Sequence, residues 1–150
     1  MRAGTRRARL RAAFVRDQAA TTFTTILDHL IGRIPGAHGV ALVDVEGETV
    51  DYAGHADPFE IKLSAAHWRI VLGVIEDHEQ LGEPRTLVVR GTRRSFITYA
   101  LPEGYALVLL LGRRAGFNAS SRAFFDCERA LAREAGWVVA ASGRQWHAVP

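Results

Sequence analysis

One stretch of the sequence, residues 57–76, is apolar on two opposite sides when it is wound as a helix. Asp57 and Pro58 suit a helix start, because an Asp side chain accepts from free backbone N–H groups and proline fixes the first helical φ. One side gathers Phe59, Leu63, Ala66, Ile70, Gly73 and Val74. The opposite side gathers Ile61, Ala65, Trp68, Val71, Leu72 and Ile75. The polar seams between them hold Glu60, His67 and His78 on one flank and Lys62, Arg69 and Glu76 on the other.

Two apolar sides on one helix indicate burial on both, whereas the surface of a monomer needs one apolar stripe. A chain of 150 residues makes one domain with one core, so the second side indicates a partner. The side with Ala66 and Gly73 permits closer approach of another backbone, and we expect it to face outward. The residues then expected against the core are Ile61, Trp68, Leu72 and Ile75, and the opposite assignment stays open.

The net charge of +3 is unevenly distributed along the chain. Residues 1–18 hold six Arg and one Asp, for +5, and the remainder holds 13 basic and 15 acidic residues, for −2. We interpret residues 1–18 as an Arg-rich tail, and a disordered solubilising arm or a wrongly assigned start codon is favoured over contact with phosphate or an anionic membrane. The slightly acidic body argues against specific nucleic-acid binding, which needs a basic face.

The protein is predicted to be cytoplasmic. No run of apolar residues has the length of a membrane-spanning helix. The pair Arg6-Arg7 resembles a twin-arginine export signal, but no apolar region follows it before Asp17. A single cysteine, Cys127, excludes an internal disulfide framework and fits a reducing compartment, where we expect it to be a small packed hydrophobic residue.

Two further helices and five strands are predicted around the central stretch. The helices, with apolar residues at i, i+3, i+4 and i+7, cover residues 20–34 and 118–135. The strands, which are short, apolar and β-branched, cover residues 39–45, 48–53, 85–90, 95–101 and 105–112. This order, α-β-β-α-β-β-β-α with hairpin-length turns, predicts an α+β fold with a five-stranded antiparallel sheet in a helix/sheet/helix sandwich.

Alternation within these elements predicts which residues share a face. Val50 and Tyr52 alternate in the second strand, and Thr86, Val88 and Arg90 form the wetter side of the third. In the last helix, where Asn118 is the expected cap, the residues predicted to point inward are Ser121, Phe124, Phe125, Leu131 and Ala132.

No catalytic residue, metal site or cofactor site is predicted. Glu60, His67 and His78 share a seam, but helical spacing puts them roughly 10 and 16 Å apart, too far for one metal ion. Ser120-Ser121 lacks a Gly-x-Ser-x-Gly context. The segment 112–116 could receive an anion at a helix start, but it lacks the Gly-Lys-Ser/Thr ending of a nucleotide loop, which favours a plain connection.

Two segments resemble the roadblock/dynein light chain family. Residues 34–47, Ile-Pro-Gly-Ala-His-Gly-Val-Ala-Leu-Val-Asp-Val-Glu-Gly, match its helix end, Pro-Gly, strand and acidic-Gly hairpin. Residues 112–121 match its turn from the last strand into the last helix. The resemblance covers about residues 20–136, and we expect a roadblock-like domain at 19–136 with a C-terminal tail at 137–150. It implies helices one and three on one sheet face and helix two on the other.

The resemblance also implies a function. Roadblock domains form dimers in which the second helices meet and the third strands pair edge to edge, so we expect a homodimer or a pair with a roadblock paralogue. The predicted interface comprises Phe59, Leu63, Ala66, Ile70, Gly73, Val74, Thr86, Val88 and Arg90. Relatives regulate small Ras-like GTPases of the polarity, motility or trafficking type, which implies a non-catalytic platform for such a GTPase. Eighteen Arg to one Lys favours a bacterial origin.

Two alternatives stay open. A small-ligand sensor of profilin/PAS-like shape would hold a pocket between sheet and helix, lined by converging polar groups. Tethering to nucleic acid through the Arg-rich tail would depend strongly on salt.

Overall fold

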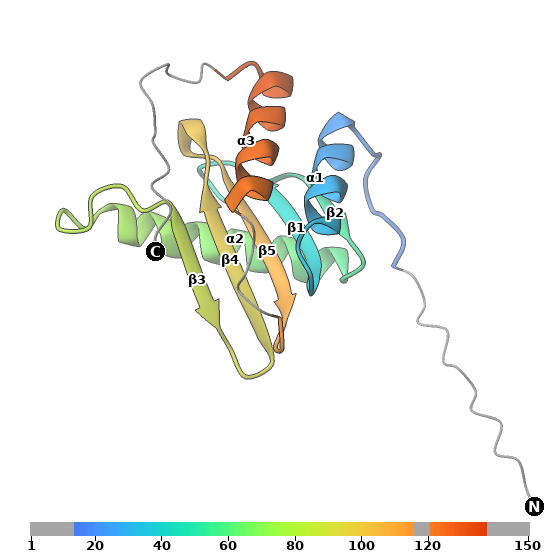
Figure 1. Cartoon of the computed structure of the whole chain (residues 1–150), viewed down its shortest axis with the longest axis horizontal. Coiled ribbons are helices and arrows are strands. Elements are labelled where there is room, and N and C mark those ends of the chain that lie inside the picture. The colour runs from blue at the N-terminus through green and yellow to red at the C-terminus, as the bar shows by residue number, and fades with distance from the viewer. Residues whose placement is uncertain (1–13, 116–120, 138–150) are drawn as a thin grey trace, which may run out of the picture.

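The computed structural model describes residues 14–115 and 121–137. Its helices are α1 (Thr22–Gly32), α2 (Pro58–Glu76) and α3 (Ser121–Ala135), with a short 3₁₀ turn, η1 (Pro102–Gly104). Its strands are β1 (Ala37–Val43), β2 (Thr49–Gly54), β3 (Thr86–Arg90), β4 (Arg94–Ala100) and β5 (Ala106–Gly112). The predicted order of elements is confirmed (Figure 1). The expected cap Asn118 lies outside the described residues.

The five strands form one antiparallel sheet in the order β2-β1-β5-β4-β3. β5 lies at the centre and is buried from Ala106 to Leu111, as expected for its continuous apolar run. β2 and β3 are the two edge strands.

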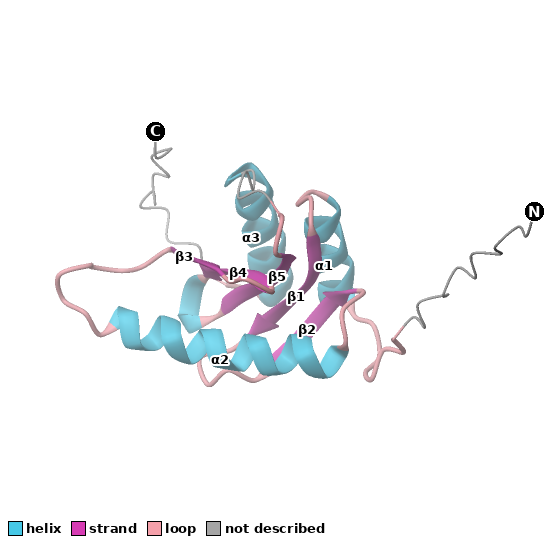
Figure 2. Cartoon of the chain, turned by 90° about the horizontal axis from the view of Figure 1, so that it is seen from below, coloured by secondary structure: helices cyan, strands magenta, loops and turns pink. Residues whose placement is uncertain are grey.

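The sheet separates two hydrophobic clusters, and Figure 2 shows α2 on one face and α1 and α3 on the other. The α2 side packs Ile61, Ala65 and Leu72 against strand residues such as Val43 and Val108. The α1/α3 side is larger and includes Leu27, Leu30, Val40, Leu107, Leu109, Phe124 and Leu131. The predicted α+β sandwich, with helices one and three together and helix two opposite, is therefore confirmed.

In α3 the inward prediction is right for three residues and wrong for two. Phe124, Leu131 and Ala132 are buried, whereas Ser121 and Phe125 are exposed. Neighbouring helical residues point about 100° apart, so Phe124 and Phe125 cannot both face the sheet. Phe124 takes the inward position and stacks on Tyr99, with ring centroids 4.9 Å apart.

The described residues continue just past α3. Trp137 is half-buried and contacts Tyr105, with ring centroids 4.8 Å apart, while Trp146 lies outside the described residues. Within the described segments, every helix is too short or too polar to cross a membrane.

Candidate interaction surface

The outward side of α2 carries a row of exposed apolar side chains. Phe59 is 71% exposed, Leu63 60%, Ile70 63% and Val74 63%. Ala66 and Gly73 lie on the same side and are partly buried. Figure 2 shows that α2 lies across one face of the sheet, and the exposure of these four side chains places them on the side of α2 that is turned away from it. The row follows one side of the helix over its whole length.

The opposite side of α2 faces the sheet. Ile61, Ala65 and Leu72 are fully buried, and Trp68 is half-buried against Phe96 at a centroid distance of 5.2 Å. The side with Ala66 and Gly73 is thus the outward one, which is the assignment favoured from the sequence. That the outward side binds a partner stays a prediction.

α2 is fixed to the rest of the domain at several points. The Asp57 side chain caps it by accepting from the Phe59 N–H, at 3.0 Å. Glu60 forms an ion pair with Arg94 of β4. Arg69, expected on a polar seam, is instead buried, and its Nε donates to the carbonyl of Gly104 in η1 at 3.0 Å. The helix and its exposed row therefore present a surface of fixed geometry.

The residues predicted on β3 lie on the other side of the sheet. Thr86 pairs with Tyr99 and Val88 with Ile97, and paired residues of antiparallel strands share a face. Tyr99 and Ile97 belong to the α1/α3 cluster, so Thr86, Val88 and Arg90 point away from α2. The structure does not bring the nine predicted interface residues into one side-chain surface. The alternation of residues in the sequence shows that Thr86, Val88 and Arg90 share one face of β3. It does not show which helix packs on that face of the sheet.

The backbone of β3 is still at the edge of the sheet. Ala100 N–H donates to the Arg85 carbonyl at 2.8 Å, which marks this pair as hydrogen-bonded. Because bonded and non-bonded pairs alternate in an antiparallel ladder, the backbone groups of Thr86 and Val88 point to the outer side of β3. The contribution of β3 to a partner surface is thus a backbone edge.

Solved structures with the same arrangement identify the fold. A Roadblock/LC7 domain from Streptomyces avermitilis matches with a TM-score of 0.63 and 16% identity, over 75% of this chain and 97% of that one. The gliding protein MglB from Thermus thermophilus matches with a TM-score of 0.65 and 17% identity, over 79% and 94%. MglB with a tetrameric arrangement matches with a TM-score of 0.67 and 17% identity, over 83% and 96%.

The chain has the roadblock/LC7 fold. No family model matches the sequence, and no curated protein matches it either. At 16–17% identity the likeness shows the roadblock fold, and what this example of the fold binds has to be argued from its own residues.

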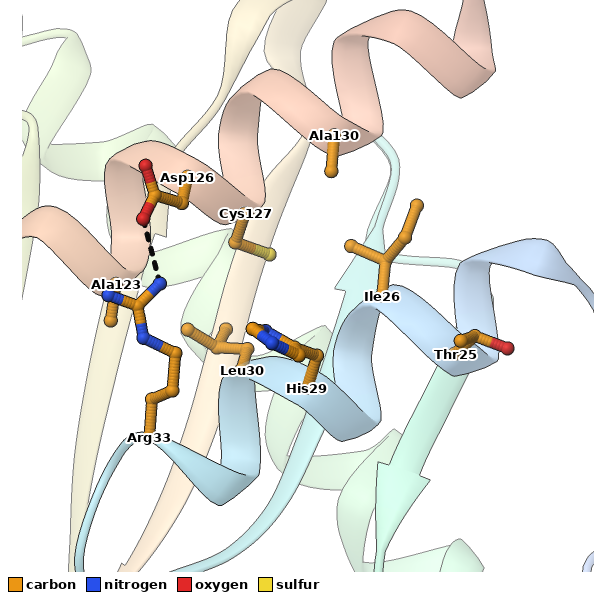
Figure 3. A pocket seen from close by; sticks show the side chains of 9 residues that line it. All are labelled: Thr25, Ile26, His29, Leu30, Arg33, Ala123, Asp126, Cys127 and Ala130. Atoms are coloured by element: carbon orange, nitrogen blue, oxygen red, sulfur yellow. Dashed lines mark hydrogen bonds and ion pairs between the residues drawn. The ribbon is translucent and has the colours of Figure 1, made fainter.

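On the face of the sheet opposite α2, α1 and α3 border a groove of about 360 Å³ (Figure 3). It is lined by Thr25, Ile26, His29, Leu30, Arg33, Ala123, Asp126, Cys127 and Ala130. Arg33 and Asp126 form an ion pair at 2.8 Å, and this hydrogen bond lowers the pKa of Asp126. The sensor hypothesis expected a pocket between sheet and helix, whereas this groove lies between two helices and its ion pair is already formed.

Four described titratable residues that the sequence singles out are Cys127, Glu60, His67 and His78. Burial raises the pKa of Cys127 to about 12, so the thiol stays protonated at neutral pH. Glu60 is held by Arg94, His67 contacts the Trp68 ring edge-on, and His78 lies beyond the end of α2. Within the residues that the structure describes, no cluster of three or more His, Cys, Asp or Glu could hold a metal ion.

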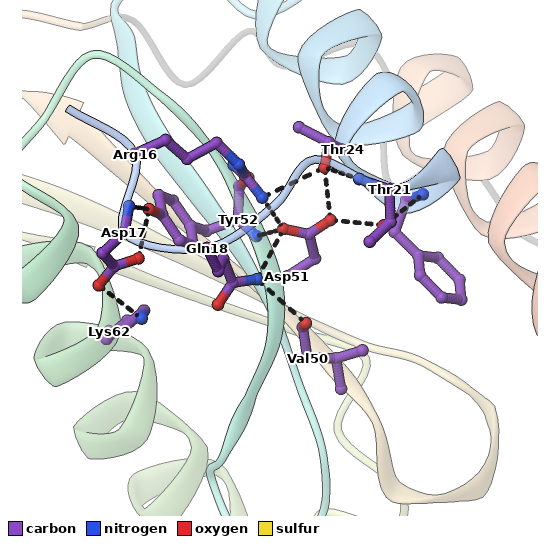
Figure 4. Close-up of polar contacts among 10 residues, drawn as sticks. Arg16, Asp17, Gln18, Thr21, Thr24, Val50, Asp51, Tyr52 and Lys62 are labelled. Atoms are coloured by element: carbon purple, nitrogen blue, oxygen red, sulfur yellow. Dashed lines mark hydrogen bonds and ion pairs between the residues drawn. The ribbon is translucent and has the colours of Figure 1, made fainter. Parts of the chain in front are cut away.

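A buried carboxylate, Asp51, is the centre of a polar network that the sequence did not indicate (Figure 4). It is fully buried at the β2 edge, and Thr21 Oγ1 and Thr24 Oγ1 donate to it at 2.7 and 2.5 Å. Arg16 forms an ion pair with it. Burial alone raises the pKa of Asp51, but the hydrogen bonds from Thr24 and Thr21, with those from the Tyr52 backbone and Arg16, outweigh burial and lower it.

Arg16 and its neighbours belong to the predicted Arg-rich tail. Gln18 Nε2 also donates to Asp51, at 3.0 Å, and Asp17 accepts from Tyr52 Oη at 2.6 Å and from Lys62 Nζ at 2.8 Å. Residues 16–18 therefore lie on the domain, whereas residues 1–13 are outside the described part of the chain. The tail boundary at residue 18 stays a prediction, and its last three residues make specific contacts.

Proposed function

We propose that this protein is a non-catalytic, dimeric interaction platform that binds and regulates a small Ras-like GTPase. The observation that carries the proposal is the exposed apolar row of α2, formed by Phe59, Leu63, Ile70 and Val74. Solved relatives of the same fold support it, since one is described as a gliding protein and another as having a tetrameric arrangement. The resemblance to the roadblock family supplies the GTPase.

The row has the character of an interface. Contiguous exposed apolar surface on a small soluble domain marks a binding site. Removing one such side chain from water is worth about 1.5–3 kcal/mol, so four of them contribute several kcal/mol to association. A second copy presents the same row, and a two-fold axis between the copies would bury both rows in a closed dimer.

The dimer is tested by Ile70→Arg, which puts a charge into the middle of the row. Wild-type protein is expected at a mass near two chains of 16.5 kDa by light scattering at micromolar concentration, and the variant near one chain. Ile70 is exposed in the single chain, so the variant should keep the native circular dichroism spectrum. Phe125→Arg is the matched control, because Phe125 is an exposed apolar residue on α3 and its change should leave the dimer intact. Unchanged dimer mass in natively folded Ile70→Arg would refute this interface.

The GTPase is tested separately with purified small Ras-like GTPases of the same genome, loaded with GDP or a non-hydrolysable GTP analogue. We expect tighter binding to the GTP-like form and a changed rate of GTP hydrolysis. Acceleration would not require an arginine supplied by the platform, because ordering the partner's own switch residues can stabilise the transition state. Equal or absent binding in both nucleotide states, with the dimer intact, would refute the GTPase assignment and leave the dimer standing.

The sensor alternative makes a different prediction in the same experiments. It expects a wild-type monomer, or a dimer whose mass changes when a small ligand binds. A wild-type dimer that Ile70→Arg converts to a monomer would contradict the monomeric form of that alternative.

A further inference from the structure

Residues 16–18 wrap around the outer edge of β2. On the α1 side of the sheet, Arg16 pairs with Asp51 and donates to Thr24 Oγ1 at 3.2 Å. On the α2 side, Asp17 joins Tyr52 Oη to Lys62 of α2 (Figure 4). The Arg16 guanidinium also lies 4.4 Å from the centroid of the Tyr52 ring. We call residues 16–18 the strap.

The strap bonds two outer carbonyls of β2, and Asp51 bonds one outer N–H. Arg16 Nη1 donates to the carbonyl of Tyr52 at 2.6 Å, and Gln18 Nε2 donates to the carbonyl of Val50 at 3.4 Å. The Tyr52 N–H donates to Asp51 Oδ1 at 2.8 Å. β1 takes the other side of β2, so these bonds lie along the free edge. An edge strand whose outer N–H and C=O groups are already bonded is a poor template for strand pairing.

We propose that the strap closes the β2 edge against the β3 edge of a second copy of this chain, and so limits strand pairing between copies to β3. Pairing of β3 with β3 is two-fold symmetric and closes on itself, whereas pairing of β3 with β2 leaves a free edge at each end and continues. The proposal goes beyond the GTPase platform and does not depend on the α2 row.

The test opens the edge in the full-length protein. Arg16→Ala with Gln18→Ala removes both side chains from the β2 carbonyls. We expect the weight-average mass to rise with protein concentration and to reach at least about twice that of the wild type, measured by light scattering and sedimentation velocity. Arg133→Ala, which removes the same charge from an exposed position on α3, is the control and should keep the wild-type mass.

A further substitution identifies the pairing edge. Val88 points its N–H outward from β3, so Val88→Pro removes a donor from the outer edge without removing a β3–β4 bond. Added to the strap variant, it should abolish the heavy species. Heavy species that persist with Val88→Pro would show aggregation by another route and overturn the proposal.

Folding of the strap variant is monitored by circular dichroism and thermal melting. If the double substitution unfolds the protein, Gln18→Ala alone opens the Val50 carbonyl and keeps the Arg16–Asp51 ion pair, and it should raise the mass in the same concentration-dependent way to a smaller extent. A natively folded variant that keeps the wild-type mass up to the highest concentration would refute the proposal. That result would leave the α2 interface untouched, because Ile70→Arg tests it independently.

Discussion

Asp51→Ala tests the buried polar network most directly. The substitution leaves its donors without their acceptor: the Arg16 guanidinium, the Gln18 amide, two Thr hydroxyls and the Tyr52 N–H. Removing one partner of a buried ion pair costs about 3–5 kcal/mol. The Arg16 side chain is 25% exposed and can be partly rehydrated, so we take a lower cost, about 2–3 kcal/mol.

The loss is measured by urea and thermal denaturation at pH 7 and at equal protein concentration. At about 3 °C per kcal/mol for a chain of this size, the midpoint temperature should fall by about 6–9 °C. Asp17→Ala is the matched control, since it removes an acid from the same network whose side chain is 47% exposed. Asp17→Ala removes an exposed ion pair and the single hydrogen bond from Tyr52 Oη, so it should lose less stability than Asp51→Ala.

The pH dependence gives a second reading of the same carboxylate. The pKa of folded Asp51 is lowered from its ordinary value of 3.8, so the folded protein holds the ionised form more strongly than the unfolded chain does. Its contribution is complete at neutral pH, falls once the pH drops below about 4, and is lost as the pH passes through the lowered pKa. The difference between wild type and Asp51→Ala should therefore shrink on acidification. A loss at pH 7 no larger than that of Asp17→Ala, or a difference that grows in acid, would refute the network as a source of stability.

Two further predictions concern packing and thiol chemistry. Leu72→Ala removes a fully buried side chain from the α2 core and should cost about 2–5 kcal/mol in urea unfolding, whereas Val74→Ala, 63% exposed on the same helix, should leave the stability of the monomeric Ile70→Arg background nearly unchanged. Equal losses would refute the orientation of α2. Because burial raises the pKa of Cys127 to about 12, a disulfide reagent at pH 8 should label it only after urea is added, and rapid labelling of the native protein would contradict its burial.

The periodicity of apolar residues predicted the fold because, in most helices and strands, apolar residues that recur at the helical or strand period are buried. The run Ala106–Leu111 is apolar throughout and became the central strand, and the two apolar sides of residues 58–76 became a helix with one side on the sheet and one side exposed. Both results follow from residues within a single element. A helix with two apolar sides needs a packing partner for each side, and this rule was sufficient to locate the candidate surface on α2.

The errors have long-range causes. Asp51 follows the alternation of β2, which separates it from Val50 and Tyr52, but its burial depends on Arg16 and on Thr21 and Thr24 of the first helix start. The sequence pattern predicts Arg69 as a solvated residue on the polar seam of α2. In the structure, η1 places the Gly104 carbonyl where it accepts a hydrogen bond from Arg69. Likewise, the side of the sheet on which Val88 lies depends on pairing with β4. A periodic pattern assigns faces, but it does not say which distant segment covers a face.

Charge counting shows the same limit at the N-terminus. The charge count assigns Arg16 and Asp17 to the Arg-rich tail. In the structure, Arg16 forms an ion pair with Asp51, and Asp17 forms one with Lys62. These two charges cancel in the sum, so residues 1–13 alone, with five Arg and no acid, carry the +5. The strap fixes the point at which this basic segment joins the domain, at the β2 edge and beside Lys62 on α2.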